Sequence, residues 1–194
     1  MYICMTVFYT ASYYGKKTYQ KHYDLVRTMI KRFKVELISP EEGNYQSVLD
    51  SGTAATMTDP FMRHYESIRQ GIHTADCTII EGSYQDFQLG HEATLAIMEK
   101  KPVLVLSTHE DFSKKINHDY FFGARYTPQT IEGTIQNFFV KVREFSQSRR
   151  FNMFLYTSQV EHLESMGKKY DMNMSEYIRR LINLDRRSAR MSAA

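Results

Sequence analysis

The pattern of hydrophobic and polar positions divides most of the chain into alternating strands and helices. Runs rich in apolar, β-branched and aromatic residues predict strands at 2–10, 35–39, 77–81 and 102–107. Apolar residues that recur at three-to-four spacing predict helices at about 21–33, 60–74, 89–100 and 129–145. Asp59-Pro60 is a good helix start. The stretch 41–57 has no such period, and we expect a long loop there.

This alternation predicts an α/β fold. Strands as apolar as these must be covered on both faces, so the economical architecture is a doubly wound, flavodoxin-like parallel sheet with helices on either side. In such sheets ligands bind at the carboxyl ends of the strands. We therefore expect ligand-binding residues in the loops 10–18, 39–59 and 82–91.

Length and composition limit the number of domains and the environment. A chain of 194 residues has room for one α/β domain, 1–147, and one small C-terminal module, 148–194. No apolar run approaches the length of a membrane span, and the N-terminus does not look like a signal peptide, so we expect a cytoplasmic protein with no membrane partner. Cys4 and Cys77 lie in apolar runs and are expected to be reduced, buried thiols. We expect neither a metal nor a cofactor.

The segment from Ala75 to Glu92 holds the most informative group of polar residues. Glu81 ends a predicted strand, and Glu92 is expected in the first turn of the following helix, with Gly90 allowing close approach of a ligand. Asp86 lies six residues before Glu92, so the two carboxylates are able to face each other across a pocket. The alternative is that Glu92 only caps its helix and Asp86 is a solvated loop residue.

The sequence ADCTIIEGSYQDFQLGHEATLAIMEKKPVLVL resembles the active-site stretch of the nucleoside 2-deoxyribosyltransferase family, including its deoxynucleoside-monophosphate N-glycosidase branch. The resemblance covers residues 1 to about 145. It implies that Glu92 is the nucleophile that attacks the anomeric carbon and that Asp86 binds the base and helps it leave. Glu81 and Gly90 are further candidate substrate contacts.

The predicted first strand is also similar to the opening strand of that family, in which a tyrosine orients the nucleophile. Gapless matching places Phe8 there, whereas a shift of one residue places Tyr9 there, and Tyr9 is our candidate. Ser12 follows at the end of the strand. The chain departs from the family at Ile68, where an acid is usual, and Glu66 is more than half a turn away. This departure favours a relaxed substrate range or a hydrolase over a strict transferase.

Two further groups of residues are candidate substrate contacts. Gly15, Lys16 and Lys17 follow the first strand and are suited to gripping a 5′-phosphate, although paired lysines on a surface loop are also ordinary. In the family a neighbouring subunit completes the pocket. This implies contacts in trans from Ser113, Asn117 and the run 120–126, whose aromatic residues are equally suited to a core.

The C-terminal module carries most of the positive charge. Arg149 to the end holds nine Lys and Arg against five Asp and Glu, whereas residues 1–148 hold sixteen against seventeen. This asymmetry fits either a polyanionic partner or a solvated helix face. The pattern predicts a strand near 150–155, a helix at about 158–170, and a helix capped by Ser175.

This pattern resembles a ribbon-helix-helix domain, an obligate dimer whose paired strands enter the DNA major groove. The resemblance implies that Arg150, Asn152 and Phe154 point toward DNA. Arg and Asn suit base edges, whereas Phe154 is as well suited to a partner or a thymine methyl. The alternative is a dimerisation module that does not contact DNA.

Taken together, these features favour an enzyme that cleaves or transfers the N-glycosidic bond of a nucleoside or nucleotide and forms a homodimer or higher oligomer. One alternative is a DNA-binding regulator whose α/β domain senses a nucleotide without catalysis. Another, suggested by fusions of this domain to DNA-binding segments in bacterial defence systems such as retron effectors, is a toxin that degrades nucleotides or NAD.

Overall fold

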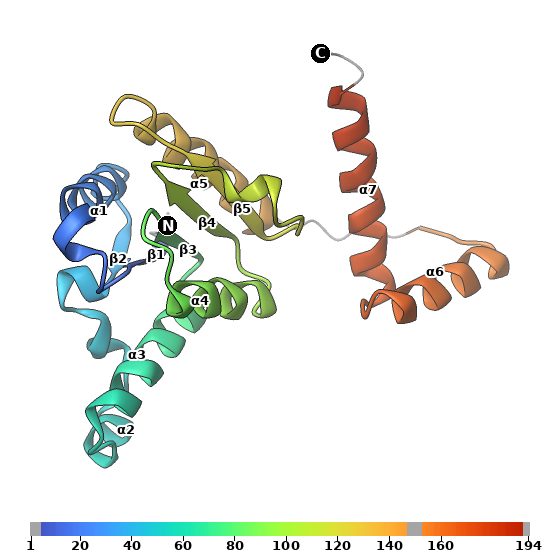
Figure 1. Cartoon of the computed structure of the whole chain (residues 1–194). Helices are drawn as coiled ribbons and strands as arrows, with labels where there is room; N and C mark the ends of the chain where they lie inside the picture. The colour runs from blue at the N-terminus through green and yellow to red at the C-terminus, as the bar shows by residue number, and fades with distance from the viewer. Residues whose placement is uncertain (1–4, 147–152, 192–194) are drawn as a thin grey trace. The chain divides into compact units, whose positions relative to one another are not determined.

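The computed structural model describes residues 5–146 and 153–191. Contacts divide the chain into two compact units, Met1–Gln147 and Ser148–Ala194 (Figure 1). No helix in the described part of the chain is long and apolar enough to cross a membrane.

The first unit is built on a five-stranded parallel sheet in the order β2-β1-β3-β4-β5. The parallel sheet with flanking helices agrees with the doubly wound α/β class expected from the sequence. The strands are β1 (Thr6–Ala11), β2 (Glu36–Ile38), β3 (Cys77–Glu81), β4 (Val103–Ser107) and β5 (Phe121–Arg125).

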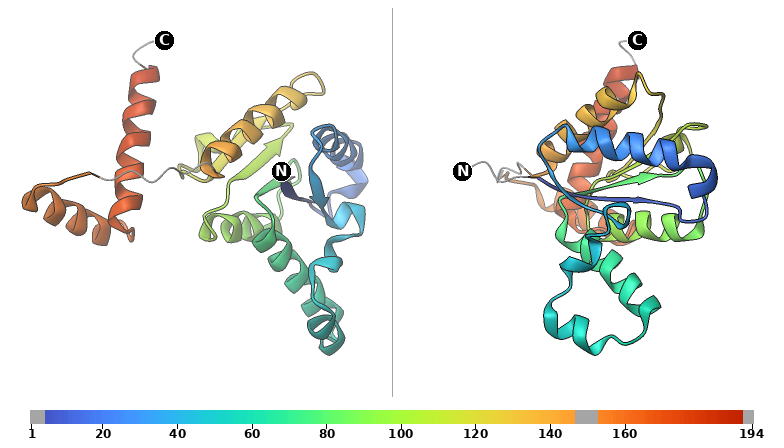
Figure 2. Two further views of the ribbon diagram at one scale, coloured as in Figure 1. Left: turned by 180° about the vertical axis from the view of Figure 1, so that it is seen from behind. Right: turned by 90° about the vertical axis from the view of Figure 1, so that its left-hand side faces the viewer.

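Helices cover both faces of this sheet (Figure 2). α1 (Lys16–Lys31) and α5 (Ile131–Ser146) pack on one face, where Val26, Ile30 and Ile135 join the core. α3 (Pro60–Thr74) and α4 (Phe87–Met98) pack on the other, through residues such as Ile72 and Ala96. Every residue of β3 and β4 is buried, which explains why these strands carry so few polar side chains.

Several boundaries differ from the sequence expectation. α1 begins at Lys16 rather than near residue 21, so the prediction that Lys16 and Lys17 belong to a loop is wrong. The stretch expected to be a long loop contains short helices: η1 (Pro40–Glu42), η2 (Tyr45–Val48) and α2 (Ser51–Thr56). β5 was not predicted; it follows η3 (Phe112–Lys114) and forms an edge of the sheet.

α3 agrees with its prediction because its start has a clear chemical cause. The Asp59 side chain accepts a hydrogen bond from the Phe61 amide, and Pro60 occupies the first helical position, where its missing N–H costs nothing. Ile68 and Ile72 then face the sheet on successive turns.

The second unit contains α6 (Thr157–Lys169) and α7 (Met174–Met191), which contact each other. Leu163 on α6 and Tyr177 on α7 are buried. The expected cap at Ser175 is wrong. Asn173 caps α7 instead, since its side chain accepts from the Glu176 amide at 3.0 Å while the Glu176 carboxylate accepts from the Asn173 amide at 2.9 Å. Residues 153–156 have no regular secondary structure in this single chain, and the first half of the predicted strand lies outside the described residues.

Candidate active site

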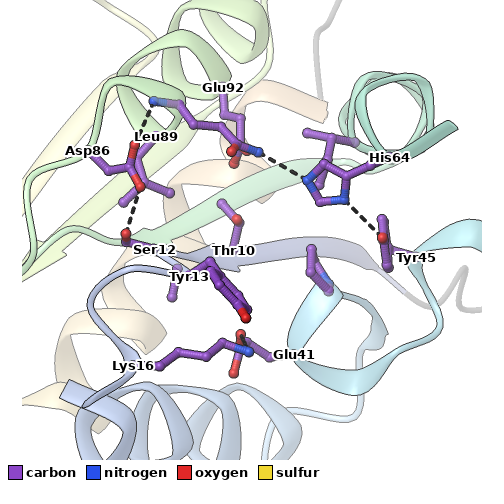
Figure 3. Close-up of a pocket in the computed structure, with 14 residues that line it drawn as sticks. Thr10, Ser12, Tyr13, Lys16, Glu41, Tyr45, His64, Asp86, Leu89 and Glu92 are labelled. Carbon is purple, nitrogen blue, oxygen red and sulfur yellow. Dashed lines mark hydrogen bonds and ion pairs between the residues drawn. The ribbon is translucent and has the colours of Figure 1, made fainter. Parts of the chain in front are cut away.

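A cavity of about 290 Å³ opens at the carboxyl end of β1 (Figure 3). The strand order changes direction between β1 and β3, and in open α/β sheets the crevice at such a point is where ligands bind. The lining comes from five parts of the first unit: the end of β1, the start of α1, the segment after β2, α3 and the start of α4. The lining residues on which the chemistry depends are Thr10, Ser12, Lys16, Glu41, His64, Asp86, Gln88 and Glu92.

Glu92 is the most buried ionisable group that lines this cavity, with 1% of its surface exposed. Its Oε1 accepts a hydrogen bond from Nε2 of Gln88 at 3.0 Å, whereas Oε2 has no hydrogen-bond partner among the described residues. Burial raises the pKa of Glu92 to about 7; the Thr10 hydroxyl and the Gln88 amide oppose the rise, and the charge of Asp86 adds to it. The free oxygen therefore belongs to a carboxyl group that ionises near neutral pH.

The position of Glu92 in its helix corrects one expectation. α4 begins at Phe87, which puts Glu92 in the second turn, beyond the first-turn amides. It does not cap the helix. That role belongs to Asp86, whose Oδ1 accepts from the Gln88 backbone amide at 3.0 Å.

Asp86 and Ser12 meet across the carboxyl end of the sheet. The Ser12 hydroxyl donates to Oδ2 of Asp86 at 2.6 Å, and Ser12 is itself 2% exposed. Both residues line the cavity with Glu92, so the structure brings together three of the residues singled out in the sequence. Asp86 has two roles here, as a helix cap and as part of the cavity wall.

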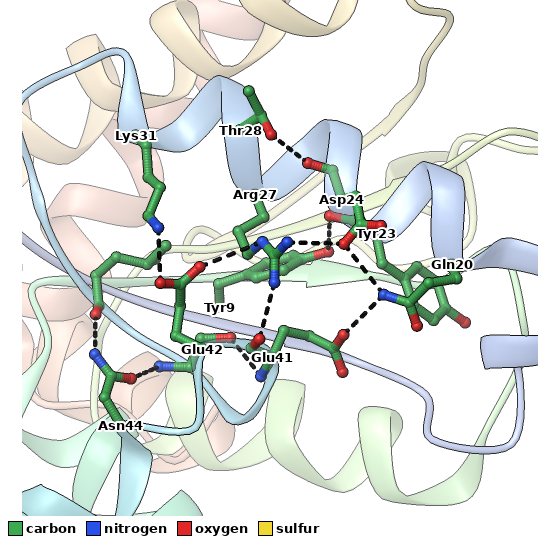
Figure 4. Close-up of polar contacts among 12 residues, drawn as sticks. Tyr9, Gln20, Tyr23, Asp24, Arg27, Thr28, Lys31, Glu41, Glu42 and Asn44 are labelled. Atoms are coloured by element: carbon green, nitrogen blue, oxygen red, sulfur yellow. Dashed lines mark hydrogen bonds and ion pairs between the residues drawn. The ribbon is translucent and has the colours of Figure 1, made fainter.

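Lys16 also lines the cavity, but it already has a partner. Its Nζ lies 2.9 Å from Oε1 of Glu41, a carboxylate whose side chain is 5% exposed. Figure 4 shows how this wall is held: Arg27 donates to the Glu41 carbonyl oxygen at 2.9 Å, and Gln20 donates to Oε2 of Glu41 at 3.1 Å. Side chains of α1 thus bind the segment after β2, and together the two form one wall of the cavity.

His64 and Tyr45 complete the cavity on the side of α3. Nδ1 of His64 lies 2.9 Å from the Tyr45 hydroxyl, and Nε2 lies 3.2 Å from the Gln88 side-chain nitrogen. Burial lowers the pKa of His64, so the imidazole is neutral at pH 7. Ile68, one turn further along α3, adds an apolar surface to the cavity. Glu66 is ion-paired with Arg69 and does not line the cavity.

No protein-family model matches this chain. No match was found among curated proteins either. Among residues 5–146 and 153–191, no three His, Cys, Asp or Glu side chains converge as a group able to hold a metal ion.

Phe8 and Tyr9 lie outside the cavity. Phe8 packs under α3, where a Cβ on Gly71 would overlap its ring. Tyr9 is on the opposite face of the sheet, where its hydroxyl donates to the Tyr23 carbonyl oxygen at 3.0 Å. Its side chain therefore points away from Glu92. Because side chains alternate along a strand, Thr10 shares the face of Phe8 and is the β1 residue that neighbours Glu92.

Glu81 also lies on the far side of the sheet from Glu92. It is fully buried, and its carboxylate accepts from the Tyr126 hydroxyl at 2.9 Å and from the hydroxyl of Ser83. Burial raises the pKa of Glu81, while the Ser83 and Tyr126 hydrogen bonds lower it. Glu81 therefore links the loop after β3, through Ser83, to Tyr126, the residue that follows β5. It does not line the cavity.

The remaining candidates in the first unit have structural explanations. Lys17 is exposed on α1, and Gly15 is needed for packing because a Cβ there would overlap the Tyr23 hydroxyl. Gly90 lines a second, largely apolar cavity of about 320 Å³ beside α4. Ser113 donates its hydroxyl to Asp111 at 2.7 Å in the turn that starts η3.

The residues expected to act in trans belong to a single chain here, so no contact with a neighbour is described. Phe121 is 6% exposed and Tyr126 is 2% exposed, which places these two in the core of their own chain. Asn117 lies on the surface in the loop before β5. In the C-terminal unit, Phe154 is fully exposed, whereas Arg150 and Asn152 lie outside the described residues.

Sequence reasoning missed Thr10, Gln88, His64, Tyr45 and Glu41. For two of these residues the sequence pattern does indicate a position near the cavity. Strand alternation puts Thr10 on the same face as Phe8, and helix spacing puts His64 one turn before Ile68. Tyr45 and Glu41 lie in a stretch without periodicity, so their approach to the cavity depends on tertiary contacts.

Proposed function

We propose that this protein cleaves the N-glycosidic bond of a nucleoside or nucleotide, with Glu92 as the nucleophile. The observation that carries the proposal is the Oε2 atom of Glu92, which is buried, has no hydrogen-bond partner in the described part of the chain, and belongs to a residue that lines a cavity. An oxygen that is neither solvated nor hydrogen-bonded is available for bond formation once the carboxyl group is ionised.

The reaction then has two steps with retention of configuration. Oε2 of Glu92 forms a bond to the anomeric carbon while the bond to the base nitrogen breaks, and that nitrogen keeps the electron pair and takes a proton from solvent. In the second step, water attacks the same carbon, loses a proton and frees the carboxylate together with the sugar. A second base in place of water makes the reaction a transfer.

Asp86 and Ser12 are suited to hold the base in this scheme. Each Asp86 oxygen already accepts one hydrogen bond and keeps a further lone pair, so the carboxylate is able to accept from an N–H group of a base. Ile68 presents a methyl surface where the resembling family has an acid. This apolar surface supports a broad choice of base, and hydrolysis rather than strict transfer.

The flavodoxin-like arrangement expected from the sequence is part of the proposal. Its support is the strand order β2-β1-β3-β4-β5 together with a cavity at the point where that order changes direction.

The test is release of free base by the full-length protein from a panel of ribonucleosides, deoxynucleosides, their 5′-monophosphates and NAD. Wild type should release base, and Glu92→Gln should lower the rate at least about 1,000-fold because an amide is not a nucleophile. Glu132→Gln is the matched control, since Glu132 makes only an exposed ion pair with Arg32. Saturable nucleotide binding without release would contradict the enzyme and support a sensor.

For the second unit we propose a ribbon-helix-helix dimer that binds DNA. The support is a set of apolar side chains on α7 that are exposed in the single chain: Leu181, Ile182 and Leu184. α7 also packs on α6. A second copy is the partner that would cover these side chains, because two helices of this size bury too little surface alone.

The test of this second proposal is a gel shift with random DNA fragments. The paired change Arg150→Ala and Asn152→Ala should reduce DNA binding, since both residues are expected on the strand that enters the groove. Unchanged binding, or no binding by wild type, would leave dimerisation as the role of the unit.

A further inference from the structure

Gln88 lies between two ionisable residues from different helices. Its side-chain nitrogen is 3.0 Å from Oε1 of Glu92 on α4 and 3.2 Å from Nε2 of His64 on α3. A side-chain amide nitrogen carries two hydrogens, so it is able to donate to both neighbours at once. One side chain thus connects the candidate nucleophile to the histidine in the cavity wall.

These contacts determine the proton positions on His64. Since Nε2 accepts from Gln88, the single proton of the neutral ring is on Nδ1 and is donated to the Tyr45 hydroxyl, 2.9 Å away. The Tyr45 oxygen also accepts from the Gln46 side chain at 3.2 Å, which leaves its own proton free to be donated. These hydrogen bonds require a neutral His64 with its proton on Nδ1.

We propose that Gln88 and His64 are positioning residues that hold Oε1 of Glu92, so that Oε2 is the oxygen that attacks, and that this holds only while His64 is neutral. The inference rests on the proposed function. Gln88 is at an exposed position and would otherwise turn toward solvent, so the acceptor on His64 is what keeps its amide directed at Glu92.

Protonation of His64 would reverse the arrangement. A proton on Nε2 would face the Gln88 amide hydrogens, and the amide would have to turn its oxygen toward His64. That oxygen would then face Oε1 of Glu92, an unfavourable contact unless Glu92 also takes a proton. The other ionisable groups that line the cavity are Tyr13 before α1, Lys16 on α1, Glu41 on η1, Tyr45 on η2 and Asp86 before α4. The contacts of the Gln88 side-chain nitrogen described here are those with Glu92 and His64.

The main test is the pH dependence of kcat/KM in the full-length protein, with the substrate found by the free-base assay. In wild type the acid limb should be steeper than about tenfold per pH unit, because His64 and Glu92 must both lose a proton before the enzyme is active. His64→Gln places a side-chain oxygen where Nε2 was and cannot titrate. The acid limb of this variant should change by about tenfold in kcat/KM per pH unit. Its kcat/KM on the alkaline plateau should lie within about threefold of wild type.

His64→Ala removes the acceptor altogether and should lower kcat on the alkaline plateau by about tenfold, with KM changed less than about threefold. The rescue by glutamine but not alanine separates positioning from a structural role. His91→Gln is the control, because His91 is an exposed histidine on α4 that stacks on Tyr65 and does not line the cavity.

Two results would overturn the positioning role: a His64→Gln acid limb as steep as that of wild type, or a His64→Ala plateau equal to that of His64→Gln. Failure of the proposed function is a different result, namely a Glu92→Gln variant as active as wild type. A variant set in which Glu92→Gln is inactive and His64→Gln is indistinguishable from wild type rejects only the positioning role.

A second measurement does not need activity. Nitrogen-15 NMR of histidine-labelled full-length protein at pH 8 should show His64 protonated on Nδ1 and bare on Nε2, assigned by loss of the signals in His64→Gln. A proton on Nε2 instead would contradict the hydrogen-bond directions on which the inference depends.

Discussion

Gln88 donates to Oε1 of Glu92 at 3.0 Å, and the other oxygen of that carboxylate has no hydrogen-bond partner among the described residues. A buried carboxylate with one oxygen held and one free is costly for folding, because desolvation disfavours its charge and only part of the loss is recovered. Such an arrangement is expected at a site where chemistry requires it.

Glu92→Gln should stabilise the protein at alkaline pH. Burial raises the pKa of Glu92 to about 7 in the folded protein, so the folded state holds a proton that the unfolded state releases near pH 4.5. Stability is therefore lost as pH rises from about 4.5 to 7. The glutamine variant avoids this loss and should be more stable at pH 8, by up to about 3 kcal/mol.

Urea unfolding of both proteins at pH 5 and pH 8 measures this difference. The advantage of the variant should be small at pH 5 and large at pH 8. An equal difference at the two values would mean that Glu92 does not titrate between them, in conflict with its buried environment.

Asp86→Ala and Asp59→Ala form a matched pair. Each aspartate caps a helix by accepting from the amide two residues later, so each change should cost about 1 kcal/mol of stability. Only Asp86 lines the cavity. Asp86→Ala should therefore lower kcat/KM for base release at least about tenfold, while Asp59→Ala leaves it unchanged. Equal activity in the two variants would remove Asp86 from the site.

Lys16→Met should reduce the preference for 5′-monophosphates over the corresponding nucleosides. Lys16 is the lysine that lines the cavity, although any phosphate has to share its ammonium group with Glu41. The ratio of kcat/KM for the two substrate classes should fall about tenfold, the effect of one charge-assisted contact. Lys17→Met, at an exposed position outside the cavity, should leave the ratio unchanged. The same fall in both variants would indicate a general effect of surface charge.

Leu181→Glu should weaken self-association through the second unit. Leu181 is 42% exposed on α7 in the single chain, and a second copy would cover it in the proposed dimer. Light scattering after gel filtration should show a smaller assembly for the variant than for wild type, with unchanged circular dichroism. Identical masses would place the contact elsewhere.

The parts of the fold that could be predicted are those where burial and local signals agree. β3 and α3 were expected with the bounds they have, because an all-apolar run and an Asp-Pro start leave few alternatives. β5 was missed because only Phe121 of its five residues is fully buried, so its pattern is weak. The early start of α1 was missed because Lys16 and Lys17 are polar and do not belong to the apolar residues whose helical spacing predicted the helix.

The candidate site could be predicted only in part. Glu92, Asp86, Ser12 and Lys16 follow strand ends and converge at one edge of a parallel sheet, which is a property of topology. Tyr9 was expected near Glu92, but the strand alternation directs it to the α1 face and leaves Thr10 near Glu92. The contact from His64 through Gln88 depends on how α3 packs beside α4, and no local pattern encodes it.

The most direct test of the central claim is mass spectrometry of the full-length protein, acid-quenched during turnover of the substrate that the free-base assay identifies. A peptide that contains Glu92 should gain the mass of one sugar residue, and this gain should be absent from Glu92→Gln. Steady release of base with the sugar attached to a different residue, or with an inverted product and no attached sugar, would contradict the claim.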